Sequence, residues 1–209
     1  MADIALDNES IPTTPAAGVS VLYVDNVTKR LSHRNDTGTV YSLGLSNYST
    51  AAQSPAAATR TYIAGSAISV PTAKLQVGTC LRWTMSVTKT GAGIAASTYD
   101  ICVGTAGTTA DTARVSFTKP AGTAVADEGT IVINAVVRSI GAAGVMVGQF
   151  SMTHNLASTG HATIPSVNVN TISAGFDMTV ANLIVGVCVT SGASDALTFQ
   201  LVQAEAWNI

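Results

Sequence analysis

Three histidines, His33, His154 and His161, are the residues of this 209-residue chain best suited to hold a metal or to move a proton. His154 and His161 enclose the short polar stretch NLASTG. A metal site needs three or four converging ligands, and no acidic or cysteine side chain lies close to this pair in the sequence. The pair therefore predicts a polar loop and no metal site, although in a trimer one histidine from each subunit could meet on the axis.

Four acidic residues lie in the middle of the chain: Asp100, Asp111, Asp127 and Glu128. A glycosidase needs two facing carboxyl groups, about 5 to 9.5 Å apart. Asp127 and Glu128 are neighbours, so on a strand they would point to opposite faces, and the sequence ADEG favours a turn instead. No GxSxG motif is present, and the glycine-rich stretch 104–113 lacks the Lys and Ser/Thr order of a phosphate-binding loop. The sequence thus predicts no enzymatic activity and no cofactor.

Three cysteines, Cys80, Cys102 and Cys188, are far apart in the chain. No CxxC pair occurs, so neither a zinc site nor a framework of disulfides is indicated. Each cysteine lies in an apolar run typical of a strand, and we expect three small buried side chains. Free cysteines also fit synthesis in a reducing cytoplasm.

Aromatic residues make up only 5% of the chain. Trp83 and Trp207 lie in alternating apolar runs, so both are expected in the core. Tyr41, Tyr48 and Tyr62 are the candidates for exposed aromatic side chains, which could stack on a sugar ring.

Charge is scarce as well, at 11% of residues against about 25% in a typical soluble domain. A surface with so little charge is most simply explained if other subunits cover much of it. The formal net charge is −2 and no long basic run occurs, which predicts no binding of nucleic acid. No run approaches 18 apolar residues, so no membrane span is expected, and the acidic N-terminus does not look like a signal peptide.

From residue 60 onwards, the sequence is a succession of short apolar runs separated by turn-forming residues. In the clearest run, 74–90, Leu81, Trp83 and Met85 alternate with polar residues as on a half-buried strand. Other strands are expected at 61–71, 98–104, 113–119, 130–140, 144–155, 162–172, 176–180, 182–191 and 196–209. This spacing predicts an all-β, antiparallel β-sandwich of jelly-roll type over residues 61–209.

Two of these expected strands, TIVINAVV (130–137) and LIVGVCV (183–189), are apolar on both faces. A strand of this kind must be covered on both sides. One face would pack on the opposing sheet, and the other is expected to pack against a neighbouring subunit.

Residues 1–45 have a different character. The first twenty contain Pro12 and Pro15 and little to bury, so we expect an extended arm there. SVLYVD (20–25), KRLSHR (29–34) and TVYSLG (39–44) then alternate like three short strands. They predict a small β-meander without a core of its own, followed by a linker over residues 46–60.

The order of a proline with small residues, LYVD (22–25), KRL (29–31), Asp-Thr-Gly (36–38) and V-x-x-L (40–43) resembles the N-terminal segment of many tailed-bacteriophage virion proteins, such as head fibres, capsid decoration proteins and tail fibres. The remainder, with CLRWTMSVTKT and FQLVQAEAWNI, resembles the jelly-roll domains attached to such proteins. This resemblance implies a structural role at the virion surface, commonly as a homotrimer, after synthesis in the host cytoplasm. The front segment would dock on the capsid or another virion protein through Leu22, Tyr23, Lys29, Arg30, Arg34 and Asp36.

We therefore expect a non-enzymatic structural component of a phage particle, either a capsid decoration protein or a head fibre. The alternative is a tail-associated receptor-binding protein that recognises host glycans, with exposed aromatic and acidic side chains at its loop tips. An enzyme that degrades polysaccharide is a third hypothesis, and it would require a cleft with paired carboxylates.

Overall fold

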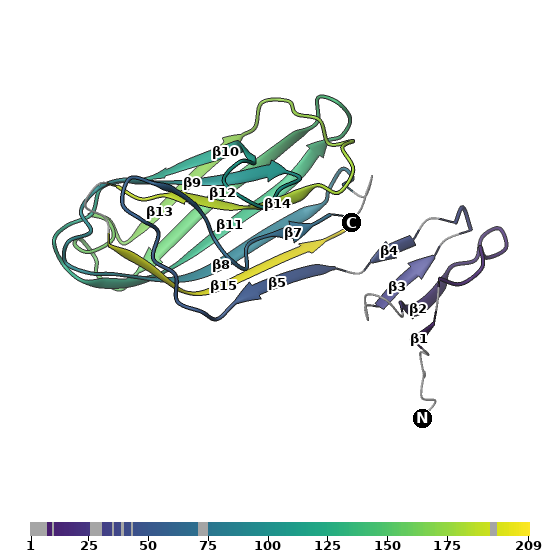
Figure 1. Ribbon diagram of the computed structural model, residues 1–209, viewed down its shortest axis with the longest axis horizontal. Coiled ribbons are helices and arrows are strands. Elements are labelled where there is room, and N and C mark those ends of the chain that lie inside the picture. The colour runs from purple at the N-terminus through teal and green to yellow at the C-terminus, as the bar shows by residue number, and fades with distance from the viewer. Residues whose placement is uncertain are drawn as a thin grey trace.

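The computed structural model describes residues 8–9, 11–25, 31–34, 36–38, 40–42, 44–70, 75–192 and 196–209. In these ranges the regular structure is entirely β, as the sequence predicts, and the strands form three sheets (Figure 1). No helix in the described ranges is long and apolar enough to cross a membrane. The strands are β1 (Asn8–Glu9), β2 (Val21–Asp25), β3 (Leu31–Arg34), β4 (Val40–Ser42), β5 (Leu45–Ser49), β6 (Arg60–Tyr62), β7 (Ile68–Ser69), β8 (Cys80–Lys89), β9 (Ser97–Gly104), β10 (Thr112–Lys119), β11 (Asp127–Ser139), β12 (Val145–His154), β13 (Ser166–Ile172), β14 (Ile184–Thr190) and β15 (Leu197–Trp207).

The first sheet is small and contains the N-terminal strands in the order β1-β2-β3-β4. Strands β2, β3 and β4 are antiparallel neighbours, which confirms the expected meander. Strand β1 was not expected, because it lies in the stretch predicted as an extended arm, and it pairs with β2 in parallel. Figure 1 draws this sheet beyond one end of the larger body.

The other two sheets form a sandwich with the topology of a jelly roll. One sheet has the order β13-β12-β11-β8-β15-β5, and the other has the order β10-β9-β14-β6, with β7 also paired to β14. The chain therefore crosses repeatedly between the sheets, and the first strand of the sandwich, β5, lies beside the last, β15. Strands β12 and β13 extend the six-stranded sheet at its edge. The strands β11-β8-β15-β5 and β10-β9-β14-β6 are then the two four-stranded sheets of a jelly roll.

The core lies between these two sheets and follows from the alternation in the sequence. Strand β8 shows it best, because Leu81, Trp83 and Met85 are buried while the residues between them face outwards. The Trp83 indole Nε1 donates a hydrogen bond to the Ser66 carbonyl oxygen at 2.7 Å, so this large side chain is both packed and satisfied. The expected core position of Trp83 is confirmed.

Trp207 was also expected in the core, and this prediction is wrong, because its exposed fraction is 40%. The cause is an irregularity in the pairing of β15 with β8 between Phe199 and Leu201. An extra residue at this point reverses which residues face inwards, so Val202 and Ala204 are buried and Trp207 points outwards.

Three further details differ from the expectations. The range 46–60, expected as a linker, includes most of β5, which pairs with β15. Residues 176–180 form no strand and contribute only an isolated bridge between Phe176 and Gly144. The turn expected at Asp127 and Glu128 is instead the start of β11, where pairing with β8 on one side and β12 on the other extends the strand.

Strand β14 does not need a neighbouring subunit to cover its outer face. Tyr62 of β6 lies over Gly186, and a Cβ at that glycine would come within 1.9 Å of the tyrosine oxygen. Arg60 covers the adjacent part of the same face by bonding to the Thr109 carbonyl oxygen at 2.7 Å. The apolar outer face of β14 is therefore covered within the chain and gives no reason to expect an intersubunit contact there. On β11, by contrast, Val136 faces outwards and is 41% exposed.

Candidate attachment and binding surfaces

The residues expected to dock on a particle have different environments in the N-terminal sheet. Tyr23 is buried, with 2% of its surface exposed, so its side chain is not available on the surface of this segment. Leu22 points the other way and is 47% exposed. Lys29 and Arg30 lie outside the described residues. Among the described members of the set, Leu22 is thus the apolar side chain available for contact.

Arg34 and Asp36 hold the extended segment 11–20 against the sheet. The Arg34 guanidinium donates to the carbonyl oxygen of Pro12 and, through Nε, to that of Gly38 at 3.2 Å. Asp36 Oδ2 accepts a hydrogen bond from the Gly18 amide at 2.7 Å. Both charged side chains therefore stabilise the N-terminal segment itself. Their contact with a particle stays a prediction.

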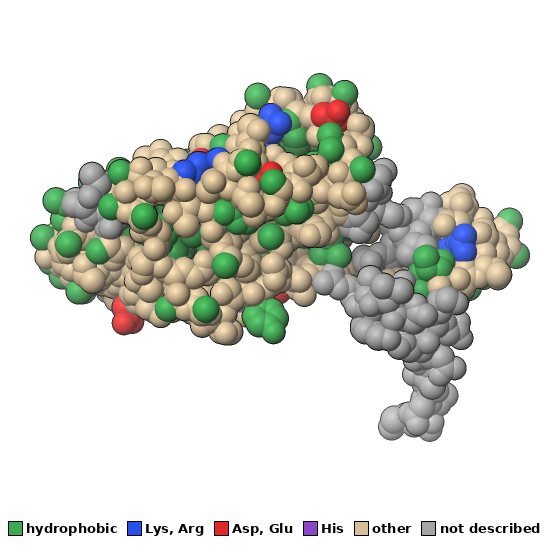
Figure 2. Space-filling view, in the orientation of Figure 1, with side chains coloured by type: hydrophobic (Ala, Val, Ile, Leu, Met, Phe, Trp, Pro, Cys, Tyr) green, Lys and Arg blue, Asp and Glu red, His purple; other side chains and the backbone are tan. Residues whose placement is uncertain are grey.

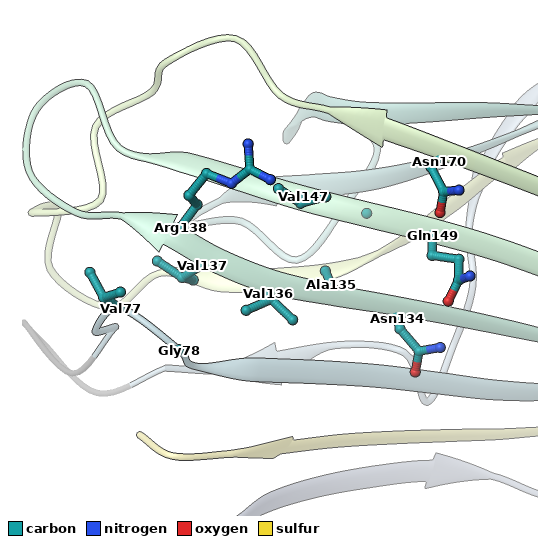
Figure 3. A pocket seen from close by; sticks show the side chains of 11 residues that line it. Val77, Gly78, Asn134, Ala135, Val136, Val137, Arg138, Val147, Gln149 and Asn170 are labelled. Atoms are coloured by element: carbon teal, nitrogen blue, oxygen red, sulfur yellow. The ribbon is translucent and has the colours of Figure 1, made fainter.

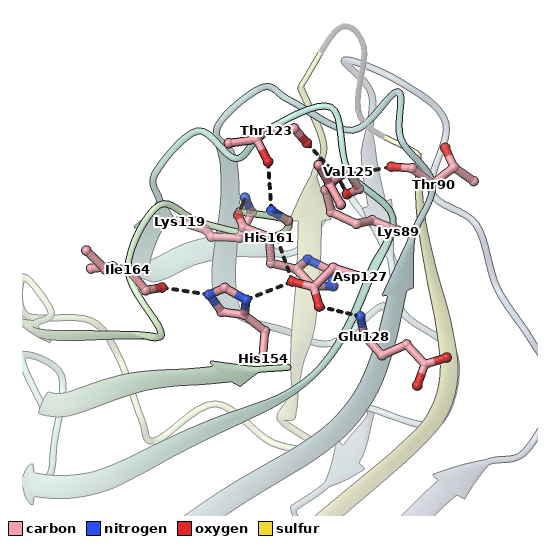
Figure 4. A network of polar contacts seen from close by, with 11 residues as sticks. Lys89, Thr90, Lys119, Thr123, Val125, Asp127, Glu128, His154, His161 and Ile164 are labelled. Atoms are coloured by element: carbon pink, nitrogen blue, oxygen red, sulfur yellow. Dashed lines mark hydrogen bonds and ion pairs between the residues drawn. The ribbon is translucent and has the colours of Figure 1, made fainter. Parts of the chain in front are cut away.

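The two histidines beyond residue 150 belong to a buried polar network at one end of the sandwich (Figure 4). His154 Nδ1 lies 2.7 Å from Asp127 Oδ2, and its Nε2 lies 2.6 Å from the Ile164 carbonyl oxygen. The His161 amide donates to the same Asp127 oxygen at 2.9 Å. Burial by itself raises the pKa of Asp127, but these donors and the Glu128 amide outweigh it and lower the pKa below its usual value.

Two lysines complete this network. Lys119 Nζ donates to the carbonyl oxygens of Pro120 and His161, each at 2.8 Å. Lys89 Nζ donates to carbonyl oxygens of the 120–126 loop, including that of Val125 at 2.6 Å. Because backbone carbonyls receive both ammonium groups, the network fixes loops at the end of the sandwich.

The geometry of the network does not resemble a catalytic triad. In a triad, the second histidine nitrogen faces a hydroxyl or thiol nucleophile, whereas His154 Nε2 faces a backbone carbonyl. His161 is fully buried, and neither of its ring nitrogens meets a hydrogen-bond partner among the described residues. Burial lowers its pKa to about 4. Within the described ranges, no group of three or more His, Cys, Asp or Glu side chains is placed to hold a metal.

The remaining acids of the middle of the chain also have structural partners. Asp100 bonds to Arg60 Nε at 3.3 Å and to Ser116 Oγ at 2.7 Å. Asp111 accepts from the amides of Ala106 and Gly107 and so closes its own loop. Asp127 is buried while the adjacent Glu128 is exposed on the opposite face.

The cysteines are free, as expected, but only Cys102 and Cys188 are buried; Cys80 is half-buried. A hydrogen bond with Cys188 and burial together raise the pKa of the Cys102 thiol. A protonated thiol is a poor nucleophile, so Cys102 is not placed for catalysis.

The outer face of the six-stranded sheet carries a row of polar residues that runs across all six strands. Directly paired residues, one per strand from β13 to β5, form this row: Asn170, Gln149, Asn134, Arg82, Glu205 and Ser46. All six side chains face outwards. Along most of these strands the residues on either side are buried, and Ser46 is placed on the same face by its pairing with Glu205. We call these six residues the polar row.

A second row lies beside the polar row, one pleat towards the end of the sheet. It consists of Ile172, Val147, Val136, Cys80 and Trp207, which are likewise directly paired from β13 to β15. We call these five residues the apolar row. Ile172 and Trp207 at its two ends are exposed by 56% and 40%. The face therefore presents parallel bands of opposite character.

The polar row passes through two hollows in the surface. Asn134, Gln149 and Asn170 line the larger one, of about 580 Å³, together with apolar-row residues such as Val136 and Val147. Figure 3 shows the three amides side by side on successive strands, on the same side of the sheet. A second hollow of about 310 Å³ lies at the opposite end of the row and is lined by Ser46, Glu205 and Trp207, among others.

The exposed aromatic residues lie on strands rather than at loop tips. Tyr48 on β5 is 70% exposed and pairs with Gln203 on the same outer face. The side chain of Tyr62 is packed over Gly186 and only half-buried, and that of Tyr41 lies outside the described residues. Figure 2 shows that Lys, Arg, Asp and Glu side chains are few and scattered on the face that it displays.

No protein-family model and no curated protein matches the chain. Two solved structures have a distant likeness. The CBM2 module of an evolved Dit protein from Lactobacillus casei BL23 phage J-1 has 8% identity and a TM-score of 0.28, with 68% of this chain and 69% of that one covered. A protein of unknown function from Shewanella oneidensis MR-1 has 11% identity and a TM-score of 0.29, with 78% and 87% covered.

Proposed function

We propose that this chain is a non-enzymatic structural component of a tailed-phage particle, a capsid decoration protein or head fibre, attached through its N-terminal segment. The observation that carries the proposal is the division of its sheets. Among the described residues, β1 to β4 pair only with one another, and the strands of the sandwich pair only among themselves. Such a division suits a small docking unit followed by a domain that projects from the particle.

The docking contact is expected to use exposed apolar side chains of the N-terminal segment. Ile11, Val19 and Leu22 are exposed by 55%, 48% and 47%. Large apolar side chains on so small a unit are favourable to bury against a partner. The resemblance of LYVD and KRL to segments of phage virion proteins supports the same assignment, as well as a homotrimer on the virion surface.

The test is co-sedimentation of purified chain with phage particles that lack it. Leu22→Asp is expected to reduce the bound fraction at least tenfold, because it places a charge in the apolar contact. Ile140→Asp is the matched control, since Ile140 is 53% exposed on the sandwich. Unchanged binding of the Leu22→Asp chain and of a chain that lacks residues 1–42 would refute attachment through this segment. Electron microscopy of labelled particles would then show whether the protein sits on the head or the tail.

Recognition of host glycans is a second candidate function. The parallel polar and apolar rows on the six-stranded sheet favour it, because a sugar chain also offers both kinds of surface. Attachment to a particle and binding of a glycan are compatible, since they use different parts of the chain.

A further inference from the structure

We infer that the outer face of the six-stranded sheet binds a neutral, extended oligosaccharide, which lies along the polar row and crosses the strands. This inference deepens the second candidate function and does not depend on attachment to a particle. It names the site, the class of ligand and the residues that recognise it.

The length of the row suits a chain of sugar rings. Neighbouring strands in a sheet are 4.7–4.9 Å apart, so a row across six strands is roughly 24 Å long. Sugar rings can sit in the hollows at the two ends of the row. One hollow is lined by Asn134 and its neighbours, and the other by Glu205 and Trp207. Arg82 lies between them, directly paired with Asn134 and Glu205.

The three amides of the row have unused hydrogen-bonding capacity. The side-chain amides of Asn134, Gln149 and Asn170 form no hydrogen bond with any described residue, although they lie side by side (Figure 3). The next pair along the same two strands behaves differently, because Ser151 Oγ donates to Asn168 Oδ1 at 2.7 Å. Each amide offers two donors beside an acceptor, a combination that matches neighbouring hydroxyl groups on a sugar ring.

The apolar row supplies the second half of the recognition. A sugar ring has hydroxyl groups at its edge and C–H groups on its faces, so it is best held between a polar and an apolar band. Val136 and Val147 border the larger hollow, and the exposed indole of Trp207 borders the smaller one. Aromatic rings with one exposed face provide large, rigid contact surfaces for such ligands.

The charges on this face favour a neutral ligand. Arg82 and Glu205 are opposite in sign and directly paired, so they balance at the centre of the row. Arg138 beside the larger hollow and Glu128 near the other end of β11 add one charge of each sign to the same face. No excess of positive charge is present to attract a polyanion. A second copy of this chain is the competing occupant, and it would have to fill both hollows, because stable protein interfaces pack closely.

The experiment is calorimetric titration of the full chain with a panel of neutral hexasaccharides built from glucose, galactose, mannose or N-acetylglucosamine, with a hyaluronan hexasaccharide as the anionic probe. At least one neutral probe is expected to bind with a sub-millimolar Kd, and the anionic probe at least tenfold more weakly. Asn134→Ala combined with Gln149→Ala, and separately Trp207→Ala, are each expected to weaken binding at least tenfold. Asn168→Ala is the matched control and is expected to change Kd less than twofold, because that amide lies on the same face outside the row.

Three results would overturn the inference: no neutral probe binds the wild-type chain, binding is indifferent to the row variants, or the hyaluronan probe binds best. Sedimentation of the same variants tests the competing occupant, since dissociation of an oligomer by the row substitutions would show that the face is a subunit contact. Circular dichroism and thermal unfolding verify that each variant is folded. Co-sedimentation with particles is expected to be unchanged in the row variants, so failure of the glycan site and failure of particle attachment are distinguishable.

Discussion

Substituting the buried His161 is expected to remove most of the sensitivity of this protein to mild acid. His161 is fully buried without a hydrogen bond to its ring among the described residues, and burial lowers its pKa to about 4. In the unfolded chain the same ring has an ordinary histidine pKa of about 6.5. Between these two values the unfolded state takes up a proton that the folded state does not, so the free energy of unfolding falls as pH falls.

The size of the effect follows from the two pKa values. Linkage gives a loss of about 2 kcal/mol between pH 7 and pH 5, and about 3 kcal/mol by pH 4. Asp127 does not interfere in this window: its pKa is lowered by its hydrogen bonds, so its stabilising contribution is lost only below about pH 4. The variant His161→Leu keeps both backbone hydrogen bonds of residue 161, to Asp127 and from Lys119, and removes only the titrating ring.

The measurement is urea unfolding at pH 7.0, 6.0 and 5.0, at one protein concentration because the chain is expected to be oligomeric. The His161→Leu chain should be at least as stable as the wild type at pH 7 and should lose about 2 kcal/mol less on going to pH 5. Ser151→Ala, on the outer face of the six-stranded sheet, removes no titrating group; it is the control and should keep the wild-type slope. Equal slopes for His161→Leu and the wild type would refute the assignment of this pH dependence to His161.

Three further substitutions test the network and the core by the same unfolding assay. Asp127→Asn should destabilise the fold by about 3 kcal/mol, since it removes the charge that partners buried donors; a loss below 1 kcal/mol would contradict the buried network. Gly148→Ala should cost about 2 kcal/mol, because the new Cβ would lie 2.7 Å from the Phe117 ring of the opposing sheet. An unchanged urea midpoint would mean that the two sheets can move apart at little cost in free energy. Trp83→Phe should cost about 2–3 kcal/mol, for the lost bond to Ser66 and for the cavity left by the smaller ring, and a stabilised variant would argue against both.

The all-β class and most strand positions could be predicted from the sequence, because alternation of apolar and polar residues is a local signal. The run around Trp83 is an example, since its burial follows directly from period two. The same logic failed at Trp207, because the irregularity after Phe199 reverses the alternation and depends on pairing with β8. It failed at Asp127 because ADEG favours a turn locally, while two neighbouring strands extend the backbone there.

The candidate glycan site could not be predicted from the sequence, because it too depends on how the strands pair. Asn170, Gln149 and Asn134 lie on three strands, and the other members of the polar row, such as Arg82 and Glu205, lie on two more that are over a hundred residues apart in the chain. Each residue alone reads as an ordinary outward-facing side chain of its strand. Only the registers between strands turn them into one continuous row beside the apolar row. A one-residue slip of β12 against β11 would bury Gln149 and break the row, so the registers that complete the hydrophobic core also assemble the binding face.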